Sequence, residues 1–207
     1  MGRQTATAAC EGFGGLGAVG ALCYVKSARL CEVRMHLIEC THARHRLAIL
    51  EILNEAIANS TALYDYVARE PASMDAWFLA KDAGAYPVIG AEDAAGNLLG
   101  FASYGTFRAW PAYKYTVEHS VYVHKDHRRT GVGNALLQQL VQRAITQQYH
   151  VLIGGIDADN RASIQLHEKL GFQLAGTIQQ AGFKFGRWRD LAFYQRIFST
   201  PVAPVDG

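Results

Sequence analysis

Helical and strand-like hydrophobic patterns alternate along most of this chain, and this alternation restricts the possible folds more than any other feature. Apolar residues three or four positions apart predict a helix over residues 43–58, namely Leu47, Leu50, Leu53 and Ile57. Valines at alternate positions within residues 116–123 predict a strand, because side chains two apart share one face of a sheet. The alternation is typical of an α/β or α+β domain, and it argues against a helix bundle or a sandwich of strands.

The other elements follow from the same patterns and from turn residues. A helix with glutamines on its polar side is expected around residues 136–144, and Gly171 is expected to end the helix that precedes it. The remaining expected elements are a first strand that begins at Met35, a short helix capped by Ser73, a hairpin of residues 87–91 and 98–104, a strand at 151–156, a helix at 162–170 and a closing strand at 188–198.

The length of 207 residues suits one domain with appendages, and residues 35–198 are expected to form that domain. Residues 1–34 are rich in Gly and Ala and show neither period, so they are expected to be a leader. The leader is interpreted as a disordered segment or as the result of a mis-set start before Met35, with a signal peptide as the alternative. Residues 199–207 carry two prolines and are expected to form a loose tail.

Composition excludes several classes of protein. Half of the residues are apolar and 18% are charged, a balance that can bury a core and excludes disorder of the whole chain. A formal net charge of +2 is too small to hold a polyanion, which disfavours nucleic-acid binding. The longest uncharged N-terminal stretch, residues 12–25, is shorter than the roughly 18 to 20 apolar residues of a membrane span. The four cysteines lie within the first forty residues without zinc-ligand spacing, and no metal is expected.

The segment from Val121 to Asn134 carries the most specific chemical signal. A strand, a basic loop and a helix start follow one another, with glycines at 131 and 133. Glycines allow a tight turn, and the unpaired N–H groups of a helix N-terminus can converge on a phosphate, beside the charges of Arg128 and Arg129. The alternative is an ordinary turn with solvated arginines. A Walker loop is absent, and Leu136 replaces the third glycine of a dinucleotide fingerprint, so a pyrophosphate is the expected ligand.

These residues resemble the GNAT superfamily of acetyl-CoA-dependent N-acetyltransferases, whose pyrophosphate loop has the pattern Q/R-x-x-G-x-G/A after a strand. Arg128, Gly131 and Gly133 match that pattern, and Asn160 and Ser163 open a helix that is similar to the superfamily's second cofactor segment. Within the superfamily, the sequence is most similar to phosphinothricin and methionine sulfoximine acetyltransferases. The residues that carry this second likeness are Asn54, Ser60, Thr61, the segment 117–123, the segment 181–188 and Asp190.

The resemblance implies a splayed mixed central sheet flanked by helices, with acetyl-CoA in the gap between two diverging strands. The pantetheine is then expected along the segment Val121, Tyr122 and Val123, like an added strand. The phosphates are expected on the loop Arg128, Arg129, Thr130, Gly131, Val132, Gly133 and Asn134. Asn160, Ser163 and Lys169 are further expected cofactor residues, although Asn160 can also be a plain helix cap and Lys169 can be solvated.

Acetyl transfer to an amine requires a base, because an ammonium has no lone pair. Glu118, in the strand that precedes the cofactor-pairing residues, is the expected general base, with neighbouring His119 as the competitor. Strand alternation places Glu118 and His119 on opposite faces. Many superfamily members carry a Tyr on the second cofactor helix to protonate the leaving thiolate. His167 occupies the matching position here, as the expected acid or as a histidine without catalytic duty.

The loop between residues 104 and 115 is aromatic and basic, and it is expected to bind the acceptor. Arg108 offers two parallel donors to a carboxylate or phosphinate, and Pro111, Ala112 and Tyr113 line that site by resemblance, next to Glu118. The alternative is a surface loop that packs or dimerises. The expected function is acetylation of a small amino acid or analogue by a cytoplasmic homodimer. Another amine acceptor, or a non-catalytic acetyl-CoA binding module, remains the alternative function.

Overall fold

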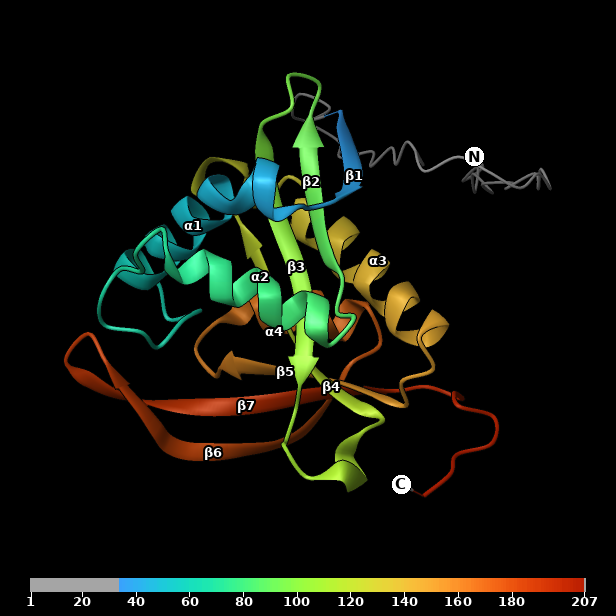
Figure 1. Ribbon diagram of the computed structural model, residues 1–207. Coiled ribbons are helices and arrows are strands. Elements are labelled where there is room, and N and C mark those ends of the chain that lie inside the picture. Colours follow the sequence, from blue (N-terminus) through green and yellow to red (C-terminus); the bar gives the residue numbers. More distant parts are fainter. Residues whose placement is uncertain (1–33, 207) are drawn as a thin grey trace, which may run out of the picture.

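The computed structural model describes residues 34–206, and Figure 1 shows their arrangement. Within this range, strands form a single sheet with the order β1-β2-β3-β4-β5-β7-β6. The strands are β1 (Met35–Glu39), β2 (Val88–Asp93), β3 (Leu98–Thr106), β4 (Thr116–Val123), β5 (Val151–Asp157), β6 (Gln173–Lys184) and β7 (Arg187–Ile197). The helices are α1 (His42–Asn59), α2 (Ser73–Ala83), η1 (Pro111–Tyr113), η2 (Lys125–His127), α3 (Val132–Thr146) and α4 (Arg161–Lys169). The expected fold class is confirmed, whereas the expected leader lies outside the described residues, apart from Arg34.

The helices cover both faces of the sheet (Figure 1). Helices α1 and α2 share one apolar cluster with Phe101 of β3, and α3 shares the other with the next residue along that strand, Ala102. Adjacent strand residues point to opposite faces, so the two clusters lie on the two sides of the sheet. Helix α4 packs on the α3 side through Ile164 and Leu166.

The central strands β4 and β5 separate halfway along their length. Strand β4 pairs with β3 from Val117 to Val123, but with β5 only from Thr116 to His119. Strand β5 continues to Asp157 with β7 as its other partner. Within residues 34–206, the second half of β4 therefore has a neighbouring strand on one side only, which confirms the expected splay.

Three details of the helices differ from expectation or sharpen it. Leu47 was expected on the buried face but is 58% exposed. The buried side of α1 is centred on Ile49, Leu53 and Ala56. Leu47 lies two positions before Ile49, which places it roughly on the opposite side of the helix. Ser73 is the first residue of α2 rather than its cap, and its hydroxyl donates to a carbonyl in the preceding turn. The helix ending before Gly171 is confirmed at Lys169.

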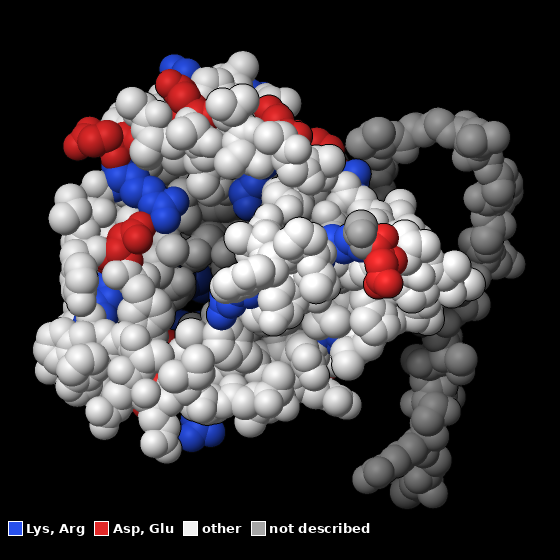
Figure 2. All heavy atoms as spheres, turned by 60° about the horizontal axis from the view of Figure 1, so that its bottom comes forward, with Lys and Arg blue, Asp and Glu red and all other residues white. Residues whose placement is uncertain are grey.

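Strand β6 was not expected from the sequence. Nearly all of its residues are exposed, so the segment shows no alternation between apolar and polar positions. Among the described strands it pairs only with β7, and the register shifts twice along that pairing. The resulting β6–β7 hairpin lies on the lower side of Figure 1. Figure 2, which brings this side forward, shows that it is hollowed, with basic side chains at the rim and in the depth of the hollow.

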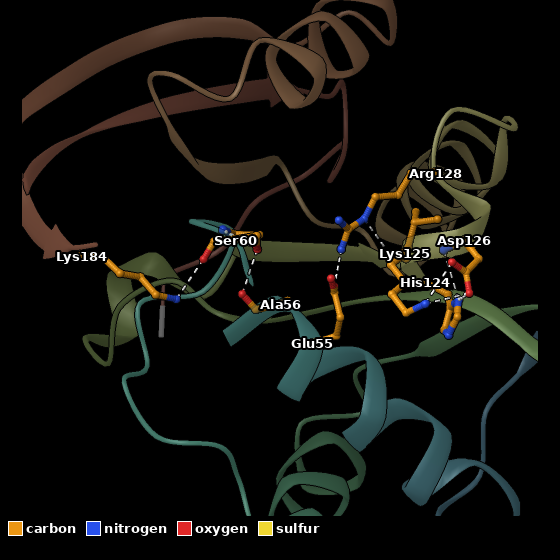
Figure 3. A network of polar contacts seen from close by, with 10 residues as sticks. Glu55, Ala56, Ser60, His124, Lys125, Asp126, Arg128 and Lys184 are labelled. Carbon is orange, nitrogen blue, oxygen red and sulfur yellow. Dashed lines mark hydrogen bonds and ion pairs between the residues drawn. The ribbon is translucent and has the colours of Figure 1, made fainter. Parts of the chain in front are cut away.

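A buried lysine fastens the tip of this hairpin to the end of α1. Lys184 Nζ donates to the carbonyl oxygens of Ile57 at 2.7 Å, Ser60 at 2.9 Å and Leu63 at 2.5 Å. These carbonyls belong to the last turn of α1 and the loop after it, where helix carbonyls lack intrahelical partners. Figure 3 shows Lys184 reaching α1 from the hairpin. The hairpin and the α1–α2 loop therefore form one wall.

We expect Lys184→Met to lower the free energy of unfolding by about 1–3 kcal/mol, because buried carbonyls lose their charged donor. Denaturant unfolding measures this loss. Lys125→Met is the control, since Lys125 is exposed and its contacts are with the neighbouring Asp126; it should change stability by less than about 0.5 kcal/mol. Equal effects of the two substitutions would show that the clamp does not stabilise the fold.

The segment after β7 packs against the start of β5. Thr200 is buried, and its hydroxyl donates to the carbonyl of Tyr149 at 2.5 Å. Further on, the Val205 N–H donates to the Tyr115 hydroxyl at 3.2 Å. Among the helices of the described range, none combines the length and the apolar character that crossing a membrane requires.

Candidate active site

The gap beside the second half of β4 exposes backbone hydrogen-bonding groups. The His124 N–H donates to the Leu99 carbonyl on β3 at 2.8 Å, and the groups that face a given neighbour alternate along an antiparallel strand. The N–H and C=O groups of Val121 and Val123 therefore face the gap, where a ligand with amide groups can pair with them. Tyr122 turns its backbone toward β3, and its ring packs 5.4 Å from the Phe101 ring, so it does not enter the gap.

The loop after β4 ends in a helix N-terminus that can hold an anion. The Ala135 N–H donates to Gly131 O, and it is the first N–H of α3 with a helical partner. The preceding N–H groups, at 132, 133 and 134, lack one and lie at the positive end of the helix dipole. Arg129 and Gly131 have positive φ angles of 64° and 94°, which curl the loop around this end, and the Thr130 hydroxyl donates to the His127 carbonyl. The arrangement fits the expected phosphate site.

The two glycines of the motif have different requirements. At Gly131, φ is in the left-handed region that only glycine adopts readily. Gly133 lies inside α3, and a Cβ there would touch Val123 and Leu166 at 3.4 and 3.5 Å, which is ordinary packing distance. The structure therefore requires glycine at 131, whereas alanine fits at 133.

Arg128 spans the distance from the loop to helix α1 (Figure 3). Its guanidinium pairs with the carboxylate of Glu55 on α1 through Nη2, and its Nε donates to the Val123 carbonyl at 3.4 Å. The expectation placed Arg128 beside the phosphates, but the structure commits much of this side chain to Glu55. Glu55 was not singled out from the sequence, where nothing marks it as the partner of a residue 73 positions later.

The start of α4 faces the same gap from the β5 side. The side-chain oxygen of Asn160 accepts from the Ser163 N–H at 3.1 Å, so the helix-cap alternative is present. This bond uses the amide oxygen and leaves the amide nitrogen available for a ligand. Lys169 is exposed at the opposite end of α4, nine residues after Asn160 and about 13 Å along the helix axis, and the structure does not bring it to the helix N-terminus.

Glu118 lies on the α1–α2 side of β4, next to β5. Its Oε1 is 3.1 Å from the position that a Cβ at Gly155 would occupy, so the missing side chain of Gly155 makes room for the carboxylate. Burial raises the pKa of Glu118, and the positive charge of Arg108 partly opposes that shift. A half-buried carboxylate with a raised pKa beside an open strand edge is suited to accept a proton.

His119 and His167 lie together on the opposite side of β4. Their rings stack with centroids 5.0 Å apart and an interplanar angle of 14°. Both are buried, and burial lowers the pKa of both imidazoles. His119 therefore lies on the face opposite Glu118, which argues against it as the competing base. The prediction that Glu118 and His119 lie on opposite faces of the strand is confirmed.

Arg108, in the expected acceptor loop, has an exposed side chain whose guanidinium carbon lies 4.4 Å from the centroid of the Phe107 ring, and its positive charge lowers the pKa of Glu118. Pro111, Ala112 and Tyr113 form the exposed helix η1, where Tyr113 packs edge-on against Phe107 at 5.8 Å. The structure thus leaves Arg108 and η1 exposed, with the charge of Arg108 acting on the pKa of Glu118.

A pocket of about 310 Å³ adjoins this side of the sheet, and no sequence pattern predicted it. The α1–α2 loop and the β6–β7 hairpin line it with Tyr64, Tyr66, Ala181, Gly182, Phe183 and Leu191. Leu191 Cδ1 lies 3.5 Å from the same Gly155 Cβ position that Glu118 approaches, so the pocket wall and the carboxylate meet at Gly155. The Tyr66 hydroxyl donates to the Phe183 carbonyl at 2.5 Å and joins the loop to the hairpin within this wall.

Comparison with known proteins agrees with this geometry. A model described as the acetyltransferase (GNAT) family matches residues 49–172. An L-methionine sulfoximine/L-methionine sulfone acetyltransferase of Pseudomonas paraeruginosa is 48% identical over 147 residues, which cover 71% of this chain and 86% of that protein.

Two solved structures are similar over most of the chain. A structure from Acinetobacter baylyi ADP1 is 57% identical with a TM-score of 0.84, covering 86% of this chain and 100% of the other. A phosphinothricin acetyltransferase from Sinorhizobium meliloti in complex with acetyl-CoA is 34% identical with a TM-score of 0.78, covering 82% and 92%.

Proposed function

The chain belongs to the acetyltransferase (GNAT) family and is an acetyl-CoA-dependent N-acetyltransferase, and from this premise we propose that it acetylates the amino group of a small amino acid or amino-acid analogue. Methionine sulfoximine, methionine sulfone and phosphinothricin are the analogues named for similar proteins. The observation that carries the proposal is the position of Glu118, beside the open half of β4 and next to the pocket, whose wall it meets at Gly155.

The residues around the gap fit acetyl-CoA. The cosubstrate supplies an acetyl group activated as a thioester. Val121 and Val123 would bind its pantetheine through backbone groups, and the N–H groups at 132–134 would bind its pyrophosphate. Asn160 would contribute its amide nitrogen. Among the described residues no group of three or more His, Cys, Asp or Glu is arranged to hold a metal.

Glu118 carries the proton chemistry on the acceptor side. Its carboxylate accepts a proton from the acceptor ammonium, directly or through water, and leaves a neutral amine with a lone pair. The backbone N–H of Val123, which faces the gap, is a donor for the oxygen that gains negative charge during acyl transfer. Arg108 provides a cation for the acidic group of the acceptor, and the neighbouring aromatic pocket receives uncharged parts of its side chain.

An amine screen tests the proposal. We expect methionine sulfoximine, methionine sulfone or phosphinothricin to show a kcat/KM about tenfold or more above that of spermidine, an aminoglycoside or a peptide N-terminus, measured by thiol release from acetyl-CoA. The small volume of the pocket beside Glu118 favours a small acceptor over a long polyamine. A preference for spermidine or the peptide would replace the proposed acceptor class. If none of the tested amines led to thiol release, the non-catalytic alternative would be supported.

We further propose a cytoplasmic homodimer. Strand β6 is an edge strand with exposed apolar side chains at Leu174 and Ile178, and Trp188 on β7 is 60% exposed. Such an edge can pair with a second copy. The cytoplasmic location is supported by the absence of cysteine after Cys40, whose buried thiol has a pKa raised to about 12. Light scattering of the purified protein tests the dimer, and a monomer at all concentrations would contradict it.

A further inference from the structure

The pocket beside Glu118 follows strand β7 away from the carboxylate. Its wall at Leu191 meets Glu118 at Gly155. Arg189 lies two residues before Leu191, on the same face of β7 and about 7 Å further along the strand. The partner of Arg189 on β6 is Gly182, which also lines the pocket. The pocket therefore extends from Leu191 to the Gly182 position.

The ring of Tyr64 lies directly on the backbone of Gly182. A Cβ at Gly182 would be 2.6 Å from Cε1 and 2.9 Å from Cδ1 of Tyr64. Both distances are well below the separation of about 3.5–4.0 Å at which carbon atoms pack. The missing side chain of Gly182 thus leaves a space on the hairpin, and the Tyr64 ring fills it.

The hydroxyl end of Tyr64 is held as well. It donates to Oδ2 of Asp157 at 3.5 Å, and Nη1 of Arg189 lies 3.9 Å from the same oxygen. Asp157 is buried and lies two residues after Gly155 on β5, so it shares the face of Glu118. Burial and the charge of Asp157 raise the pKa of Tyr64 to about 12, so the hydroxyl keeps its proton. The ring is therefore a wall of fixed position.

We propose that Tyr64 is a specificity-determining residue, whose ring, seated on Gly182, limits the size of the acceptor side chain that the pocket admits. The inference rests on the proposed function, in which the amine of the acceptor meets Glu118. A side chain that enters the pocket from there passes Leu191 and then meets the Tyr64 ring. A short side chain such as that of methionine sulfone stops before the ring, whereas a bulky aromatic one requires the space that the ring fills.

Removal of the ring tests the proposal through the choice of acceptor. We expect Tyr64→Ala to raise the kcat/KM for L-tryptophan relative to that for methionine sulfone about 10- to 100-fold, because the space on Gly182 becomes available. Tyr64→Leu keeps an apolar side chain and should shift the ratio in the same direction. Tyr64→Phe keeps the ring and should leave the ratio within about threefold of wild type. Val67→Ala is the control, since Val67 belongs to the same loop, is 78% exposed and does not line the pocket.

The converse substitution adds bulk beneath the ring. We expect Gly182→Ala to lower the kcat/KM for methionine sulfone about tenfold, because its Cβ displaces the Tyr64 ring into the pocket, while the KM for acetyl-CoA stays within about twofold. The double variant Gly182→Ala/Tyr64→Ala lacks the displaced ring and should match Tyr64→Ala alone. A merely structural role of Gly182 would not be relieved by removal of Tyr64.

Three results would overturn the proposal: an unchanged acceptor ratio in folded Tyr64→Ala or Tyr64→Leu, an equal shift in Val67→Ala, or a loss from Gly182→Ala that persists without the Tyr64 ring. Thermal melting shows which variants are folded. If the wild type acetylates neither amino acid, the proposed function fails instead. Calorimetric affinities of the two amino acids for the wild type and Tyr64→Ala, each loaded with coenzyme A, then decide whether Tyr64 limits the pocket.

Discussion

Glu118→Gln is expected to lower kcat by about 10²–10⁴, with the affinity for acetyl-CoA little changed. Glutamine keeps the shape of the side chain and can still form hydrogen bonds, but it cannot accept a proton. The space at Gly155 that receives the carboxylate receives the amide equally well, so the fold is not perturbed. Steady-state kinetics with a preferred amino-acid analogue and equilibrium binding of acetyl-CoA measure the two quantities separately.

The pH dependence of this variant distinguishes a base from a positioning group. Burial raises the pKa of Glu118, and the carboxyl must be ionised to accept a proton. The kcat/KM of the wild type should therefore rise with pH through that raised pKa, whereas the variant should lack this limb. At higher pH the acceptor amine loses its proton to water, so the deficit of Glu118→Gln should shrink.

Two outcomes would contradict the role of Glu118. A deficit of the same size at every pH would indicate positioning rather than proton transfer. Wild-type turnover in Glu118→Gln, combined with loss in His167→Gln, would assign the proton path to the histidine. Glu51→Gln is the control for removal of one negative charge, since Glu51 is exposed on α1, and it should leave kcat within about twofold of wild type.

The parts of the fold that the sequence predicted are those with a buried face. Helix α1 packs one side on the core and so has apolar residues at regular spacing, whereas strands β2 and β3 are buried on both faces and show as short apolar runs. Strand β6 has almost no buried side chain, and it is stabilised by pairing with β7, which leaves no hydrophobic period in the sequence. The Lys184 clamp joins residues more than 120 positions apart, and such a contact depends on the tertiary fold.

The parts of the site that could be anticipated are local in the sequence. The helix N-terminus at Gly131, the cap at Asn160 and the opposite faces of Glu118 and His119 all follow from neighbouring residues. The pairing of Arg128 with Glu55, the stacking of His119 on His167 and the pocket behind Gly155 join separate elements. No short-range pattern encodes them, because each depends on how α1, α4 and the β6–β7 hairpin dock on the sheet.

Gly131→Val is expected to weaken acetyl-CoA binding by about 10²–10³-fold, the second large effect. A β-branched residue at φ 94° costs about 1–3 kcal/mol of backbone strain, so the loop will relax to another conformation. The N–H groups at 132–134 then lose their convergence on the pyrophosphate, and each lost hydrogen bond to a charged group costs about 1.5–3 kcal/mol. Calorimetric titration with acetyl-CoA or coenzyme A measures the change.

Gly96→Val separates loop strain from loss of the phosphate site. Gly96 also has a positive φ, 83°, but it lies in the turn between β2 and β3. The Gly96→Val protein should lose about as much stability as the Gly131→Val protein but keep its affinity for acetyl-CoA. Gly133→Ala provides a second comparison. The added Cβ would contact Val123 and Leu166 at ordinary distances, so this substitution should change the affinity for acetyl-CoA by less than about tenfold. Wild-type affinity in a folded Gly131→Val protein, or an equal loss of affinity in Gly96→Val, would exclude the α3 N-terminus as the site that holds the phosphates.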